Sequence, residues 1–309
     1  MILAISCVLP VFIMICTGSL IRRSKLVPEG TFNHVSKVSF QYLLPCLLFY
    51  NIYTTDLDTV FDARLLTFLI AYVLIWFALA TALCIRFVPD RRARGAFVQT
   101  FFRSNIAIVG VSMADSLLGK DGVAAISVAI AFLVPLFNVL AVITLETCRG
   151  EKPDLKNTLL GIVKNPLIIA CVLGLAFMLL EIPLPAPVLK ALSQIGTAGT
   201  VMTLISLGAN FRFSGVRRNL KKVVTANVLR LVIAPLAALT AAVALGFRGG
   251  DLGIILLCTA PALAGSCYPM ALACDSDHEL TGQIVVTTSF LCCLTLFVWI
   301  FLLKQVGLM

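Results

Sequence analysis

The sequence predicts an all-α polytopic membrane protein with ten transmembrane helices, arranged as two inverted five-helix repeats in which helices four and nine are broken. Three observations support this fold class. Hydrophobic residues make up 60% of the 309 residues and charged residues only 13%, whereas roughly a quarter of a soluble domain is charged. The mean hydropathy is +1.03, so one core could not bury all the apolar side chains. The third observation is the division of these side chains into ten apolar segments separated by short basic connections.

The ten apolar segments follow one another along the whole chain. They cover approximately residues 2–21, 36–54, 65–87, 95–118, 123–147, 158–180, 187–209, 222–246, 252–273 and 281–303. A helix of about 20 residues spans a bilayer, so ten spans leave only about ten residues for each connection. No sizeable soluble domain fits, and membrane lipids are the expected surroundings.

Lys and Arg are unevenly divided between the two sides of these segments. The connections after the odd-numbered segments hold 17 of them, whereas the remaining connections and the C-terminus hold five, Arg64, Lys120, Lys190, Arg248 and Lys304. Because cytoplasmic connections are enriched in Lys and Arg, we expect a cytoplasmic-membrane protein with both termini outside. The net charge of +9 is therefore a topology signal, and no nucleic-acid partner is expected. The first apolar run has no basic region before it and is predicted to be a retained span.

The two halves, residues 1–150 and 158–309, show a weak internal similarity. Residues 111–114 in segment four align with residues 268–271 in segment nine at an offset of 157. Five spans per half would place such a repeat in opposite orientations. Paired interrupted segments at matching positions of inverted repeats indicate a transporter site near the bilayer midplane.

Segment four holds a cation, a hydroxyl and an amide in succession at Arg103, Ser104 and Asn105. A charged side chain near the centre of a span costs about 2.5–3.5 kcal/mol, so Arg103 either faces a cavity or extends to the cytoplasmic headgroups. Asn105 is too short to reach the headgroups and either joins helices or lines a polar site. We expect the helix to break near Gly110 and Ser112.

Segment nine contains Pro261, Gly265 and Pro269 within one span. Proline removes a backbone donor and clashes with the preceding turn, and glycine permits unwinding. The pattern favours a broken helix whose free N–H groups could hold a carboxylate, although a proline kink satisfied by Ser266 is the alternative. Ser266 and Tyr268 are the candidate substrate-binding residues of this segment, beside Arg103, Ser104 and Asn105 of segment four.

Other polar residues in the apolar segments are weaker candidates. Pro45 and Asn51 in segment two could border the same cavity, and Asp115 could couple transport to protons or sodium. Gly208 lies in a run of small residues that would let helices approach closely. No catalytic motif, metal-ligand pattern or cofactor motif is present, so we expect no enzyme activity, no metal and no cofactor. The 11 cysteines mostly lie in apolar runs and are expected to be small core residues.

Taken together, the chain resembles the auxin efflux carrier family, which includes bacterial malate- and malonate-type permeases. The resemblance rests on Arg103-Ser104-Asn105 with Gly110, Leu44-Pro45 with Leu47-Leu48-Phe49, Leu207-Gly208-Ala209, and Pro261 with Ala264. It implies a scaffold and a core domain, each formed from both halves, crossing helices four and nine, an elevator-like movement and an organic-anion substrate. The family commonly has proline where this chain has Ser112, which implies a less sharply broken first crossing.

The leading functional hypothesis is therefore a secondary transporter of small mono- or dicarboxylates. The alternative is a non-transporting sensor that binds a carboxylate on the same fold. Substrate identity, transport direction, coupling to H+ or Na+ and a homodimeric state stay open at this stage.

Overall fold

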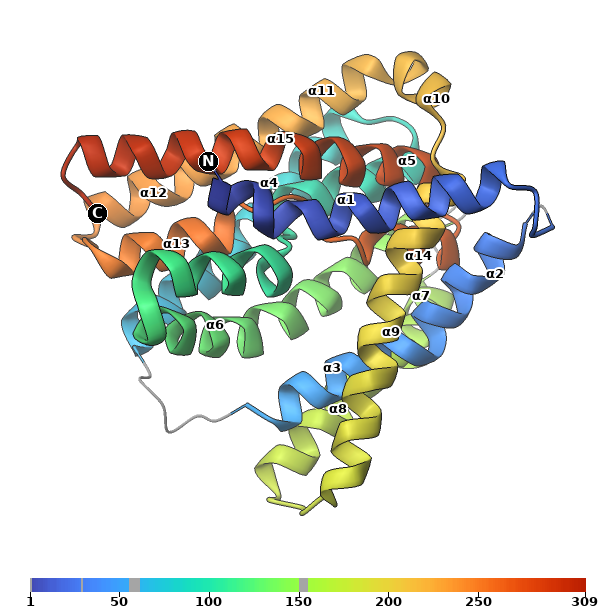
Figure 1. The fold of residues 1–309 in the computed structure, drawn as a ribbon, viewed down its shortest axis with the longest axis horizontal. Coiled ribbons are helices and arrows are strands. Elements are labelled where there is room, and N and C mark those ends of the chain that lie inside the picture. The colour runs from blue at the N-terminus through green and yellow to red at the C-terminus, as the bar shows by residue number, and fades with distance from the viewer. Residues whose placement is uncertain (1, 29, 56–61, 150–154) are drawn as a thin grey trace.

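The computed structural model describes residues 2–28, 30–55, 62–149 and 155–309, and in these ranges the chain is helical with no β-strand (Figure 1). The first half contains α1 (Ile2–Arg23), α2 (Thr31–Val38), α3 (Leu44–Tyr53), α4 (Ala63–Phe87), α5 (Arg91–Phe102) and α6 (Val111–Cys148). The second half contains α7 (Leu155–Val163), α8 (Pro166–Leu179), α9 (Ala186–Asn210), α10 (Phe213–Arg218), α11 (Leu220–Val228), α12 (Ala234–Ala244), α13 (Gly250–Thr259), α14 (Cys267–Ala273) and α15 (His278–Gln305). Short π-helical turns at Ser39–Leu43, Ile106–Gly110 and Leu229–Ile233 precede α3, α6 and α12.

Short polar side chains begin several of these helices. Asp62 accepts hydrogen bonds from the first backbone N–H groups of α4, Asp90 from that of Arg92 in α5, and Asp277 from that of Leu280 in α15. Asn165 caps α8 in the same way, immediately before Pro166. These caps satisfy donors that have no partner inside the helix, and they fix where the apolar segments begin.

Each predicted apolar segment contains helical structure, but the helices differ in length. Within the described part of the chain, five are long and apolar enough to cross a membrane, and they run over Ala63–Phe87, Met113–Cys148, Ala186–Asn210, Leu220–Ala244 and His278–Gln305. Gly119 has a left-handed φ of 68° inside α6, so the helix kinks there between predicted segments four and five. These features are those of a polytopic membrane protein.

Apart from the short helices α7 and α10, the helices form two groups. The α9 group consists of α1, α2, α3, α8 and α9, and the α6 group of α4, α5, α6 and α11 to α15. Figure 1 shows α3, α8 and α9 together at the lower right, whereas α6, α12 and α13 lie at the left. Helix α1 joins the groups because it packs against both α9 and α15.

Glycine allows the backbones of α1 and α9 to pack directly against each other. A Cβ atom added to Gly18 would lie 1.9 Å from the carbonyl oxygen of Ile205, and one added to Gly208 would lie 1.9 Å from that of Ile15. The close approach predicted from the small residues around Gly208 is therefore confirmed.

Candidate functional site

Two interrupted helices meet in the interior. Helix α5 ends at Phe102 and helical structure resumes at Ile106, while α13 ends at Thr259 and α14 begins at Cys267. The backbone N–H of Asn105, in the first interruption, donates a 2.9 Å hydrogen bond to the carbonyl of Ala262, in the second. The two interruptions are therefore in direct contact.

The first interruption is not where the sequence predicted it. Gly110 and Ser112 are helical, and the chain leaves the helix at residues 103–105 instead. Gly110 serves close packing, since a Cβ atom there would lie 2.9 Å from Ile126 and 3.3 Å from the Leu257 carbonyl of α13. In the second interruption Pro261 and Gly265 lie in the non-helical stretch, whereas Pro269 belongs to the first turn of α14, where proline is tolerated.

Arg103 is the central polar residue of the contact and is only 2% exposed. Its guanidinium donates to the side-chain oxygens of Asn138 at 2.8 Å and Ser266 at 2.9 Å. Gln99 accepts at 3.0 Å, and the Met270 sulfur lies at 2.8 Å. Three ion pairs are found among the described residues, and Arg103 takes part in none of them. The residue does not extend to the headgroups, and its positive charge is held in the interior by neutral groups.

A cavity of about 140 Å³ lies against this contact, between the two helix groups. The α6 group contributes Arg103, Ser104, Asn105, Ala107, Ile108, Val134, Phe137, Asn138, Ala264, Gly265 and Ser266. The α9 group contributes Leu44, Leu47, Leu48, Asn51, Leu167, Thr200, Thr203 and Leu204. The polar end of the cavity thus belongs to the interruptions, and most of the opposite wall is leucine.

The structure brings together only some of the predicted site residues. Arg103, Ser104, Asn105 and Ser266 all line the cavity, and Asn51 joins them from α3. Three predicted candidates do not line it, namely Tyr268, Pro45 and Asp115. Pro45 is the second residue of α3, where its missing N–H costs nothing, and Asp115 is exposed on α6.

Two buried hydroxyls in the cavity wall have no hydrogen-bond partner among the residues that the structure describes. They are the buried side-chain oxygens of Ser104 and Thr203, which come from opposite helix groups. The amide of Asn105 is also without a described side-chain partner, although the residue is only 8% exposed. Because buried polar groups are nearly always paired, these groups mark a place for a polar ligand.

Five polar residues of this region were not predicted from the sequence. Gln99 and Asn138 accept hydrogen bonds from Arg103, and Thr200 and Thr203 line the cavity. Arg230 of segment eight contacts the second interruption. Arg230, like Arg103, is a cation inside a predicted apolar segment, and this feature could have identified it from the sequence. The other four are common polar residues in helices, and only their neighbours distinguish them.

A second cavity of about 890 Å³ lies on the side of the basic connections. Arg22, Lys25, Arg212 and Arg218 line it, with Tyr268 and His278. The Tyr268 hydroxyl accepts a 2.9 Å hydrogen bond from Asn210. Tyr268 therefore belongs to a different cavity from Ser266, although only Cys267 separates them in sequence.

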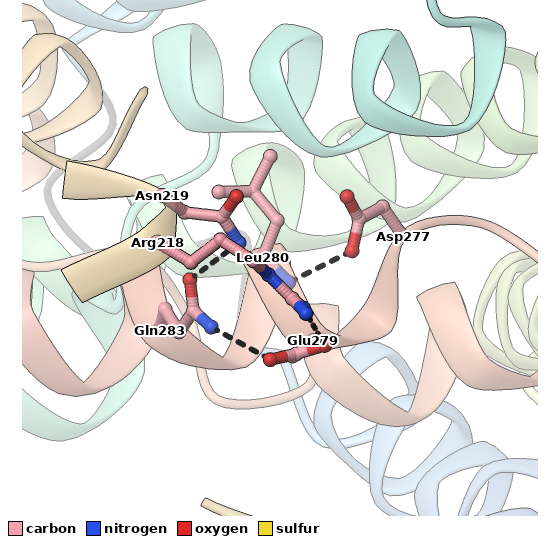
Figure 2. A network of polar contacts seen from close by, with 6 residues as sticks. All are labelled: Arg218, Asn219, Asp277, Glu279, Leu280 and Gln283. Carbon is pink, nitrogen blue, oxygen red and sulfur yellow. Dashed lines mark hydrogen bonds and ion pairs between the residues drawn. The ribbon is translucent and has the colours of Figure 1, made fainter. Parts of the chain in front are cut away.

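Polar contacts join the connection after α10 to the start of α15 beside this cavity. Arg218 pairs with Glu279 at 2.9 Å, and the Asn219 amide donates to Gln283 at 3.1 Å (Figure 2). Asp277 caps the same helix through the backbone N–H of Leu280. Among the described residues, no group of three His, Cys, Asp or Glu side chains could hold a metal ion.

Comparison with known proteins agrees with a membrane carrier. The family model described as membrane transport protein matches residues 3–154 and 151–300. A protein of Methanothermobacter thermautotrophicus, described as an uncharacterized transporter, is 22% identical over 299 residues, which cover 94% of this chain and 96% of the relative. The chain therefore belongs to the membrane transport protein family, which is the auxin efflux carrier family that its sequence resembles.

Proposed function

We propose that the protein is a secondary transporter of small organic monocarboxylates, which bind in the cavity between the two helix groups. The observation that carries this proposal is the charge of the cavity. Arg103 contributes one positive charge, and none of the described lining residues is Asp or Glu. A low-dielectric site with an uncompensated cation favours an anion.

The groups around Arg103 suit a carboxylate. Asn105 can donate from its amide, and the hydroxyls of Ser104 and Thr203 are further donors in the wall of the same cavity. The helix that resumes at Ile106 begins at this end of the cavity, since Asn105, Ala107 and Ile108 line it. The start of a helix carries roughly half a positive charge, which adds to the attraction.

The size and the far wall of the cavity favour one carboxylate over two. A cavity of about 150 Å³ lined by Leu, Ile and Phe binds benzene, so 140 Å³ admits an apolar body of about that size. The α9 group adds Leu, Thr and Asn side chains to the wall but no cation, so a second carboxylate would be buried without a charged partner, which is costly. Aromatic or branched monocarboxylates are the substrates that fit.

Transport would follow an elevator-like movement of the α6 group against the α9 group. The cavity lies between these groups, so their relative movement would open it to one side and then to the other. Ten spans in two inverted five-helix repeats and both termini outside belong to this proposal. The basic second cavity would then face the cytoplasm and attract the anion there.

Binding and flux assays test the proposal with named probes. Purified protein should be stabilised against heat by benzoate more than by succinate, and we expect at least about tenfold tighter binding of benzoate. Proteoliposomes should exchange 2-oxoisovalerate by counterflow, and protein-free liposomes serve as the control. This acid is almost fully ionised at pH 8, so it crosses lipid slowly by itself.

The outcomes separate the alternatives. Tighter binding of succinate than of benzoate would refute the monocarboxylate preference. Binding of these acids without counterflow would favour the sensor hypothesis, in which the same fold only reports its ligand. Repeating the counterflow with and without Na+ or a pH gradient determines coupling.

A further inference from the structure

Arg230 is a second buried arginine, and it lies outside the cavity. It is 2% exposed and comes from the π-helical turn Leu229–Ile233 in the eighth apolar segment. Its Nε and Nη2 atoms donate to the carbonyl of Pro261 at 2.9 and 2.8 Å, and Nη1 donates to the carbonyl of Phe101 at 3.5 Å. It takes part in none of the ion pairs found among the described residues.

These two carbonyls mark the ends of the two interrupted helices. Phe101 lies in the last turn of α5, and Pro261 follows the last residue of α13 by two positions. The C-terminal end of a helix carries roughly half a negative charge on its unpaired carbonyls. The guanidinium therefore lies beside the carbonyl ends of both helices, whose partial negative charges attract its positive charge.

The turn that carries Arg230 is itself held in place. Pro235 has no N–H for the carbonyl of Leu231, and the indole of Trp299 donates to that carbonyl at 3.0 Å instead. The Tyr72 hydroxyl donates to the neighbouring carbonyl of Ala234 at 2.7 Å. The guanidinium is therefore presented from a rigid turn, and π-helical turns of this kind are frequent at functional sites.

We propose that Arg230 is a positioning residue, a fixed internal cation that joins the carbonyl ends of both interrupted helices and so maintains the contact that forms the substrate cavity. In carriers whose half-helix carbonyl ends are open, such carbonyls coordinate a sodium ion or a proton. Here the guanidinium occupies that position. Only the expected effect on substrate binding rests on the proposed function.

The test compares Arg230→Ala, Arg230→Lys and Arg230→Met in purified, detergent-solubilised full-length protein. The readouts are the melting temperature and the affinity for benzoate. Each is measured without additive, with millimolar guanidinium chloride, and with millimolar choline chloride as the control salt. We expect Arg230→Ala to lower the melting temperature, because hydrogen bonds of a charged group are lost. Benzoate binding should weaken by about tenfold or more, because the contact that forms the cavity is loosened. Guanidinium should restore both readouts and choline neither, since choline donates no N–H.

The other two variants separate charge from packing. Lys keeps the positive charge but not the planar guanidinium, whereas Met keeps only the bulk of the side chain. The melting temperature and benzoate affinity of Arg230→Lys should therefore lie between those of wild type and Arg230→Met. Arg248→Ala is the matched control, because Arg248 also donates to carbonyls at a helix end, those of Val243 and Phe247, but is exposed. We expect no effect of guanidinium on that variant.

Several results would overturn the proposal. One is that Arg230→Met has the melting temperature and benzoate affinity of the wild type. Another is that guanidinium does not restore the melting temperature and benzoate affinity lost in Arg230→Ala. If Arg230→Ala is not recovered as folded protein, the order of Arg230→Lys and Arg230→Met decides the question alone. If the wild type binds no benzoate, the proposed function fails, whereas guanidinium recovery of the Arg230→Ala melting temperature still tests the role of Arg230.

Discussion

Replacing Asn105 by alanine should weaken substrate binding while leaving the protein stable. Asn105 precedes the helix that resumes at Ile106, but its side chain makes no capping hydrogen bond and has no other described partner. Its backbone bond to the Ala262 carbonyl would be kept, and its φ of −84° suits alanine. The substitution thus removes no side-chain hydrogen bond that the structure describes, and the melting temperature should change little.

The expected loss of affinity follows from the amide facing the cavity. A hydrogen bond to a charged group contributes about 1.5–3 kcal/mol, so losing one bond from Asn105 to a carboxylate should weaken binding roughly ten- to hundredfold. The assay is the dissociation constant for benzoate measured together with the melting temperature of each purified variant.

Asn165→Ala is the matched control. Asn165 is also buried and also precedes a helix, but its side chain caps α8 by accepting from the backbone N–H of Leu167 at 3.0 Å. Losing this cap should cost about 0.5–2 kcal/mol of stability and leave benzoate affinity unchanged. A lower melting temperature with unchanged affinity in Asn105→Ala would refute the reasoning and make Asn105 a structural residue.

Three further predictions follow from the packing and the topology. Thr203→Val should raise the melting temperature of the empty protein, because it removes a buried hydroxyl without a partner, and should weaken benzoate binding; a destabilised variant would contradict this. Gly208→Ala should strongly reduce the yield of folded protein, since its methyl group would lie 1.9 Å from the Ile15 carbonyl, whereas Gly250→Ala, with no atom within 4 Å, should not. A cysteine placed beside Arg218 should react in intact cells only with a membrane-permeant thiol reagent, and labelling by an impermeant reagent would reverse the proposed orientation.

The positions of the helices could be read from the sequence because their causes are local. Long apolar runs require a lipid environment wherever they lie in the chain, and the caps at Asp62, Asp90 and Asp277 act within one helical turn. The non-helical stretch containing Pro261 and Gly265 was equally predictable, since a missing N–H and a missing Cβ act on the neighbouring backbone.

The first interruption could not be placed in the same way. No glycine or proline lies at residues 103–105, and the bonds that hold this stretch come from distant segments. The Asn105 N–H is satisfied by Ala262, and the Arg103 guanidinium by Ser266 and Asn138. A helix can end at such a place only when partners elsewhere replace its lost hydrogen bonds, and a single segment does not reveal those partners.

By itself, the sequence determined that this is a helical membrane protein with a cation, a hydroxyl and an amide inside its fourth apolar segment. Only the tertiary structure decided which of these residues share a cavity, that Thr203 faces them from another helix group, and that Tyr268 belongs to a separate cavity. It also gave Arg230 its place at the ends of both interrupted helices. The physical reason is that hydropathy and backbone chemistry are properties of short segments, whereas hydrogen-bond partners inside a membrane are supplied by whichever helices the fold brings together.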